Sequence, residues 1–198
     1  MIALKRLPRA RCVKVDMEGR WGIAGFENGT VCVWDLETAQ LVHELSISKV
    51  KEILTNLSSN NSSSDRVIQL LFLENSKTTT INSNKKIAIS VHKNGIIREW
   101  DIIKGEMTQN IISGHMREIT DVFILPNNQQ SNHFFILTSS KDGLIKCWQR
   151  NQFHWGCKYV IQEPSEITSI AAQQLHNGMG ILVSGSVDNA VKVWDINS

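Results

Sequence analysis

Four polar residues in the middle of the chain are of the types that hydrolases use. His115, Thr138, Ser140 and Asp142 include a base, two hydroxyls and a carboxylate within 28 residues. A catalytic triad needs a hydroxyl that a substrate can reach, a histidine beside it, a carboxylate behind the histidine and a nearby oxyanion hole. The same residue types also satisfy one another when a fold buries them. The elements that position these side chains decide between the two interpretations.

No comparable pattern for a metal or a cofactor occurs elsewhere in the sequence. Asp35, Asp101 and Asp195 are separated by 66 and 94 residues and each follows a Trp, so they do not form one cluster. Cys-x-x-Cys spacing is typical of zinc sites. The four cysteines do not have this spacing. The glycine-rich phosphate-binding motifs are also missing. We therefore expect no metal site and no cofactor.

A recurring hairpin is the main organising feature. Each copy has an alternating apolar run, a tight turn of Asn-Gly, Asp-Gly or Asp-Asn, a second alternating run and a Trp, which is the pattern of a β-hairpin. The four Trp residues, Trp34, Trp100, Trp148 and Trp194, are 66, 48 and 46 residues apart. The last two spacings approach the roughly 40 to 45 residues of a four-stranded propeller blade. The hairpins span Trp21 to Leu36, Lys86 to Ile102, Phe134 to Arg150 and Gly180 to Ile196.

These hairpins resemble those of the WD-repeat family of β-propellers. The family's Trp-Asp pair occurs at Trp34-Asp35, Trp100-Asp101 and Trp194-Asp195, while the third repeat has Trp148-Gln149. The family's Gly-His element occurs once, at Gly114-His115, 33 residues before Trp148. The resemblance implies an all-β fold: a β-propeller of four four-stranded antiparallel blades.

The resemblance also implies a structural role for the triad-like residues. In WD repeats the matching positions form a buried hydrogen-bonded tetrad, here His115, Thr138 or Ser140, Asp142 and Trp148. We favour this tetrad over an active site and expect the chain not to be an enzyme. The other repeats lack the Gly-His histidine, and Asn28 and Asn94 replace the turn aspartate in the first two.

The predicted repeats cover residues 8–45, 66–112, 114–161 and 165–198, with two low-complexity inserts at 46–65 and 74–85. The last repeat lacks a fourth strand, and an additional strand is predicted at Ile2 to Leu7. We expect this N-terminal strand to complete the last blade, because closure removes an exposed sheet edge. The alternative is a larger ring. Either further sequence completes this ring, or a second copy completes it and the protein is a homodimer.

Composition and charge narrow the classes of partner. The 198 residues are 41% hydrophobic, as in a globular domain, and 21 Lys and Arg against 19 Asp and Glu give a net charge of +2. Because no dense basic run occurs, we expect neither nucleic acid nor membrane as a partner. The N-terminus lacks the apolar stretch of a signal peptide and no stretch reaches transmembrane length, so we expect a cytoplasmic or nuclear protein.

The remaining hypothesis concerns cations that could bind other proteins. Arg98, Lys146 and Lys192 each precede their Trp by two positions, and Arg11 begins the first repeat. They are candidates for a patch that binds acidic peptides or phosphopeptides. We favour the other interpretation, in which these cations occupy ordinary repeat positions on a solvated face. The sequence thus predicts a non-catalytic protein-protein interaction scaffold within a larger assembly. The alternative is a substrate-recognition adaptor of a ubiquitin ligase, which needs a docking element such as an F-box that these residues lack.

Overall fold

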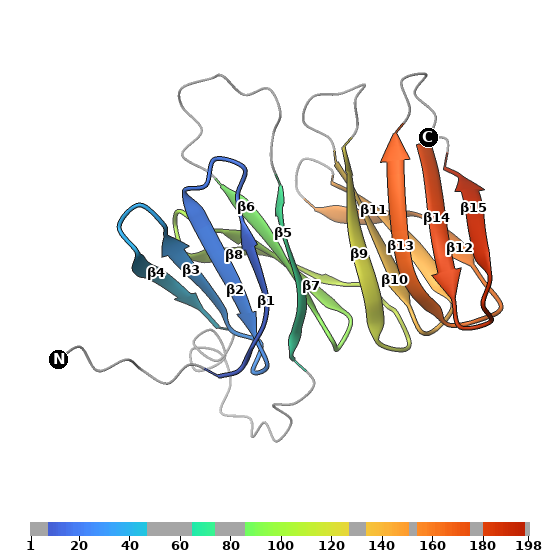
Figure 1. Ribbon diagram of the computed structural model, residues 1–198, viewed down its shortest axis with the longest axis horizontal. Helices are drawn as coiled ribbons and strands as arrows, with labels where there is room; N and C mark the ends of the chain where they lie inside the picture. Colours follow the sequence, from blue (N-terminus) through green and yellow to red (C-terminus); the bar gives the residue numbers. More distant parts are fainter. Residues whose placement is uncertain are drawn as a thin grey trace. The chain divides into compact units, whose positions relative to one another are not determined.

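The computed structural model describes residues 8–46, 65–73, 86–126, 134–150, 154–174 and 180–196, and their regular elements are β-strands (Figure 1). Four antiparallel sheets follow one another along the chain, each with its strands in sequence order or its reverse. The first sheet contains β1 (Ala10–Val15), β2 (Trp21–Phe26), β3 (Val31–Asp35) and β4 (Gln40–Leu45). The second contains β5 (Val67–Leu73), β6 (Ile87–His92), β7 (Ile96–Asp101) and β8 (Glu106–Ile112). The third contains β9 (Ile119–Pro126), β10 (Phe134–Ser140), β11 (Leu144–Arg150) and β12 (Trp155–Gln162), and the fourth β13 (Ile167–Gln174), β14 (Gly180–Ser186) and β15 (Val191–Asp195).

The turns of the four hairpins share one local geometry. The residue that ends each turn has a left-handed backbone, with φ near +80° at Gly29, Gly95 and Gly143 and +62° at Asn189. Glycine and asparagine tolerate this region best. The residue just before this left-handed residue is Asn or Asp, and its side-chain oxygen accepts a hydrogen bond from the backbone N–H two residues after itself. These residues are Asn28, Asn94, Asp142 and Asp188. Asn28 and Asn94 therefore close their turns as the aspartates do.

The fold class predicted from the sequence is confirmed, and each of the four predicted hairpins is observed as a pair of antiparallel strands. The fourth sheet has three strands in the described part of the chain, with β15 as the outer strand. The strand predicted at Ile2 to Leu7 lies outside the described residues, as do the two inserts apart from Ser46 and Asp65.

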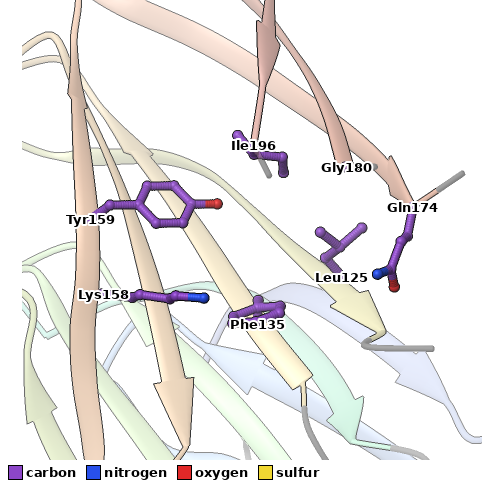
Figure 2. Close-up of a pocket in the computed structure, with 7 residues that line it drawn as sticks. All are labelled: Leu125, Phe135, Lys158, Tyr159, Gln174, Gly180 and Ile196. Carbon is purple, nitrogen blue, oxygen red and sulfur yellow. The ribbon is translucent and has the colours of Figure 1, made fainter. Parts of the chain in front are cut away.

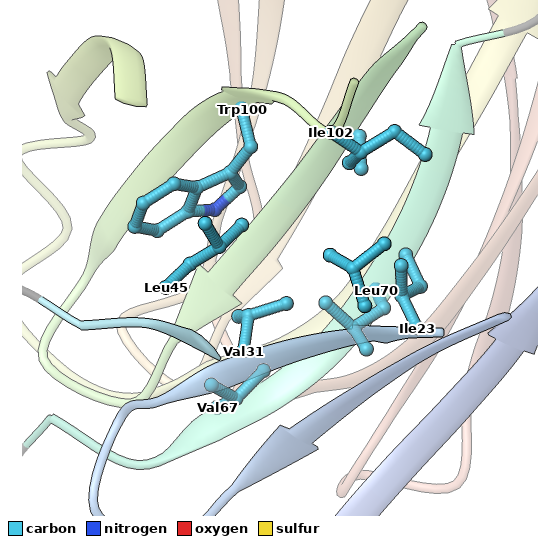
Figure 3. Packing of buried hydrophobic residues seen from close by; sticks show 9 residues of the cluster. Ile23, Val31, Leu45, Val67, Leu70, Trp100 and Ile102 are labelled. Carbon is cyan, nitrogen blue, oxygen red and sulfur yellow. The ribbon is translucent and has the colours of Figure 1, made fainter. Parts of the chain in front are cut away.

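The chain divides into two compact units, with the boundary after Asn110 within β8. Unit 1 contains the first and second sheets. Its core joins β2 and β3 of one sheet to β5, β6 and β7 of the other, and Figure 3 shows side chains of this core, among them Val31, Leu70 and Trp100. Val31, Val67 and Leu70 have no exposed surface. This apolar burial stabilises the pair of sheets.

Unit 2 contains the third and fourth sheets, whose core includes Leu137, Ile145, Ile170 and Leu182. A small cavity lies between these two sheets (Figure 2), where Lys158 Nζ lies 4.9 Å from the centre of the Phe135 ring. Its volume of about 10 Å³ leaves room for one water at most. The cavity is therefore a packing defect and not a ligand site.

Candidate functional site

The triad-like residues of the third sheet form a continuous series of hydrogen bonds. Trp148 Nε1 donates to Thr138 Oγ1 at 3.0 Å, and Thr138 Oγ1 lies 2.9 Å from His115 Nε2. His115 Nδ1 lies 3.0 Å from Asp142 Oδ2. Because the indole N–H can only donate and the carboxylate can only accept, we assign the Thr138 hydroxyl as donor to Nε2 and Nδ1–H as donor to Asp142. We call such a series, from Trp through a hydroxyl to a third side chain, a relay.

The third-sheet relay has the order of a hydrolase triad but not its accessibility. The Thr138 hydroxyl already accepts from Trp148, and Thr138 has no exposed surface. A nucleophile must meet its substrate, so this hydroxyl is not placed for acyl transfer. Ser140 takes no part in the relay; its Oγ donates to the Arg117 carbonyl and accepts from the Asp142 N–H. Of the two hydroxyls named from the sequence, the structure brings only Thr138 to the histidine.

Electrostatics in the third-sheet relay favour a neutral imidazole beside a carboxylate. Burial lowers the pKa of His115 more than the nearby Asp142 carboxylate raises it. Burial alone would raise the pKa of Asp142, but hydrogen bonds from the N–H groups of Leu144 and Met116, together with His115, lower it overall. Burial thus accounts for the lowered pKa of His115, and hydrogen bonds to the charged carboxylate account for the lowered pKa of Asp142.

A second relay, which the sequence analysis missed, occupies the second sheet. Trp100 Nε1 donates to Ser90 Oγ at 2.7 Å, and Ser90 Oγ lies 2.9 Å from His92 Nε2. His92 Nδ1 lies 2.8 Å from the Asp65 carbonyl oxygen. Here the histidine comes from β6 itself, two residues after the hydroxyl, and not from a Gly-His element. Burial lowers the pKa of His92 as well.

The fourth sheet has a relay in which glutamate replaces histidine. Trp194 Nε1 donates to Ser184 Oγ at 2.9 Å, and the Ser184 hydroxyl donates to Glu163. The Glu163 side chain is fully buried, and its second oxygen accepts from Lys192 Nζ at 2.8 Å. Glu163 directly follows β12 and precedes the first strand of the fourth sheet.

One sequence signal unites the three relays: the hydroxyl precedes its Trp by ten positions. In each hairpin the hydroxyl residue pairs across the strands with the residue two before the Trp; these pairs are Ser90–Arg98, Thr138–Lys146 and Ser184–Lys192. The hydroxyl is therefore diagonal to its Trp on the same face of the hairpin, within reach of the long indole side chain. The first sheet has Ala24 at this position and thus no hydroxyl to receive the Trp34 N–H.

The third member of each relay is harder to find from the sequence. It comes from a strand of the hairpin in the second sheet, from the Gly-His element in the third, and from the segment before the first strand in the fourth. The three side chains are His92, His115 and Glu163. No single spacing therefore identifies it.

The same register explains where three of the four predicted peptide-binding cations lie. A residue two positions before a Trp shares the face of that Trp, which is buried in the second and third sheets. Arg98 is 2% exposed, and its Nη2 lies 2.9 Å from Asp65 Oδ1. Lys146 Nζ donates to the carbonyls of Ser113 and Gly114, at 2.8 Å each.

Lys192 likewise contacts its own sheet, through Glu163. Arg11 is more exposed and lies 3.5 Å from Glu27. The expectation that these cations share a solvated face is therefore wrong for Arg98, whose guanidinium is buried and pairs with Asp65. Arg98, Lys146 and Lys192 each bind the segment that precedes the first strand of their own sheet.

The signature aspartates at the ends of two hairpins close turns. Asp35 Oδ1 accepts the N–H groups of Glu37 and Thr38, and Asp101 Oδ1 accepts those of Ile103 and Lys104. Asp195 lies exposed at the end of β15. Within the described ranges no three His, Cys, Asp or Glu side chains are grouped as a metal site would require.

Two apolar side chains of unit 2 are exposed on a fixed backbone. The Met116 side chain is 86% exposed, while its N–H donates to Asp142 Oδ2 at 2.8 Å. Val187 is 56% exposed, and its N–H donates to the Glu166 carbonyl at 3.0 Å. Glu166 also pairs with Arg117, the neighbour of Met116, and so links the two segments.

Charged residues beside Met116 and Val187 have hydrogen-bond or ion-pair partners. Arg117 donates to the Lys141 carbonyl at 3.0 Å, and Lys141 Nζ lies 3.1 Å from Glu118 Oε2. Hydrogen bonds from Ser186 and Ser165 lower the pKa of Asp188 to about 2, so this side chain is charged at neutral pH. We name this region the turn surface of unit 2; it consists of Met116, Arg117, Glu118, Lys141, Glu166, Val187 and Asp188.

Comparison with protein families matches the chain to the family described as "WD domain, G-beta repeat", at residues 106–149 and 155–195. Comparison with curated proteins found no match. Over the parts of the chain that the structure describes, no helix is long and apolar enough to cross a membrane.

Two solved structures have a similar fold. The computationally designed protein Ika8 is 24% identical, with a TM-score of 0.64 over 96% of this chain and 46% of Ika8. The computationally designed protein Ika4 is 23% identical, with a TM-score of 0.65 over 98% of this chain and 94% of Ika4. The chain thus spans less than half of Ika8 and nearly all of Ika4. Residues 106–149 and 155–195 thus match the WD-repeat family, and with its repeated hairpins and four sheets the chain has the fold of a β-propeller.

Proposed function

We propose that the chain is a non-catalytic scaffold that presents a propeller surface to other proteins within a larger assembly. WD repeats in general indicate protein-protein interaction. The observation that carries the proposal is the burial of the relay hydroxyls, because Thr138, Ser90 and Ser184 have no exposed surface and each receives the N–H of its Trp. These triad-like groups hold their sheets together and do not meet a substrate.

The turn surface of unit 2 is the contact site that we propose. Met116 and Val187 project from backbones that are already hydrogen-bonded, so a partner does not have to order them on binding. Methionine adapts its shape to different partners. Exposed apolar side chains surrounded by charged groups are typical of protein-protein interfaces.

The test is capture of partners by the tagged chain with both apolar residues changed, Met116→Asp and Val187→Asp. We expect the captured proteins to fall at least tenfold in abundance relative to wild type, with an unchanged circular dichroism spectrum. The matched control is Val160→Asp, at an exposed valine of β12 outside the turn surface. Equal capture by the double variant and the wild type would refute the proposed contact site.

The ubiquitin-ligase adaptor is the alternative within the same class of binding proteins. Three of its four candidate binding cations already bind the segment before the first strand of their own sheet, since Arg98 pairs with Asp65, Lys146 with two carbonyls and Lys192 with Glu163. No contact in the described residues favours this alternative. Recovery of ligase subunits among the captured proteins would support it, and their absence would count against it.

A further inference from the structure

Asp188 carries a fixed carboxylate in the turn between β14 and β15. Its Oδ1 accepts hydrogen bonds from the Ser186 hydroxyl and from the Ala190 N–H, which lies 3.1 Å away. Its Oδ2 accepts from the Ser165 hydroxyl at 2.9 Å. These donors come from both sides of the turn and from the segment before β13, while Asp188 itself stays exposed. A partner that binds this carboxylate therefore does not have to order it.

Asp188 differs from the other charged side chains of the turn surface in having no ion pair. The others form two ion pairs, Arg117 with Glu166 and Lys141 with Glu118. In the part of the chain that the structure describes, the donors to Asp188 are hydroxyls and a backbone N–H. Lys192, on the strand that follows, pairs with Glu163 instead, at 2.8 Å. The charge of Asp188 is therefore not neutralised by any ion pair within the described residues.

A partner that packs on Val187 also removes water from the carboxylate of Asp188, the next residue in the chain. An ionised carboxylate that loses its water is costly unless it gains an opposite charge. Hydrogen bonds from Ser186 and Ser165 lower the pKa of Asp188 to about 2, so the group does not avoid this cost by taking up a proton at neutral pH. Charge complementarity therefore favours a partner that brings a cation to this place.

The remaining hydrogen-bonding capacity of the carboxylate distinguishes lysine from arginine. A carboxylate has about four acceptor positions, two on each oxygen. Oδ1 of Asp188 already has two donors and Oδ2 has one, so one position remains on Oδ2. A bidentate arginine needs a free position on each oxygen, whereas a lysine ammonium group can bind one oxygen alone. The aliphatic stem of a lysine also suits the exposed side chain of Val187.

We propose that the turn surface of unit 2 binds a lysine side chain of a partner protein, with the ammonium group on Asp188 Oδ2 and the aliphatic stem against Val187. This inference rests on the proposed function, because it names the partner residue that binds at the proposed contact site. The ligand is thus basic, whereas the four cations named from the sequence are candidates for binding acidic ligands.

Neutralisation of Asp188 tests the ion pair. Asn28 and Asn94 close the equivalent turns of unit 1, so Asp188→Asn keeps a side-chain oxygen for closing the turn while it removes the charge. We expect the tagged Asp188→Asn chain to capture proteins from a cell extract at least about tenfold less than wild type. The matched control is Asp195→Asn, because Asp195 is exposed at the other end of β15, outside the turn surface. This control is expected to capture as wild type does, and circular dichroism checks that both variants are folded.

Zero-length cross-linking of the captured complexes identifies the partner residue. A carbodiimide activates the carboxyl group, and attack by a lysine amine in contact with it forms an amide and releases the reagent as a urea; arginine does not form this amide. We expect mass spectrometry to find Asp188 joined to a lysine of a captured protein.

The outcomes separate this inference from the proposed function. If Met116→Asp with Val187→Asp abolishes capture while Asp188→Asn leaves it unchanged, the contact site stands and the lysine inference is refuted. Reduced capture by Asp188→Asn without a lysine cross-link at Asp188 would also overturn it, because another donor then binds the carboxylate. If the double variant captures as wild type does, the contact site itself is refuted and this inference with it.

Discussion

Replacement of Thr138 by Val removes the central hydroxyl of the third-sheet relay while keeping the shape of the side chain. The Trp148 N–H and His115 Nε2 then lose their hydrogen-bond partner at a residue with no exposed surface. Each unsatisfied buried group costs about 1–3 kcal/mol, and the removed hydroxyl itself no longer needs to be desolvated. We expect a net loss of roughly 2–4 kcal/mol in the free energy of unfolding.

Urea denaturation followed by tryptophan fluorescence measures this loss. A change of this size corresponds to a fall of about 5–15 °C in melting temperature for a chain of this length. The control is Thr168→Val, because Thr168 is exposed on β13 and its hydroxyl donates to the Gly185 carbonyl at the surface. We expect the control to change stability by less than about 0.5 kcal/mol.

A double-mutant cycle with Trp148→Phe separates the relay from general packing. Trp148→Phe removes the indole N–H, so Thr138→Val leaves one unsatisfied group fewer in that background. We expect the two losses to be less than additive by about 0.5–3 kcal/mol. Additive losses, or a Thr138→Val variant as stable as the Thr168→Val control, would refute the assignment of the relay.

Two further predictions concern charge. Burial lowers the pKa values of His115 and His92, so these histidines take up protons at a higher pH in the unfolded chain than in the folded chain. The free energy of unfolding is therefore highest above about pH 6.5 and falls as the pH drops below this value. The lowered pKa of Asp142 adds a further loss below about pH 4. Unfolding measured from pH 8 to pH 5 checks this, and unchanged stability would contradict it. Replacement of Arg98 by Met removes the cation that pairs with the Asp65 carboxylate, which keeps the Asn94 amide as a donor, and should cost about 3–5 kcal/mol. Arg11→Met, at a surface pair, should cost less than about 1 kcal/mol in the same urea assay.

The strands could be predicted because their signals are local. Alternation of apolar residues and the Asn-Gly and Asp-Gly turns fix each hairpin without reference to distant residues. The Gly-His element similarly identifies His115, Asp142 and Trp148, which the structure brings together with Thr138. The N-terminal strand and the inserts remain predictions.

The other relays could not be predicted in the same way, because their third members come from different places. His92 follows its hydroxyl within β6, and Glu163 comes from the segment before β13. The burial of Arg98 is in contrast a local property, since two-residue alternation places it on the buried face of Trp100. Its partner Asp65 follows an insert, so sequence distance gives no indication of the pair.

The relays and the apolar packing act on different parts of the fold, and hydrogen exchange can separate them. The third-sheet relay holds the segment containing Met116, whose N–H donates to Asp142, whereas Leu182 packs the fourth sheet against the third. We expect Thr138→Val to speed exchange at the Met116 amide more than at the Ile170 amide, which donates to Asp121 between the two sheets. Leu182→Ala, which empties a fully buried site, should show the opposite order. Equal acceleration at both amides in both variants would mean that unit 2 opens as one cooperative body, and the relay would then have no local role of its own.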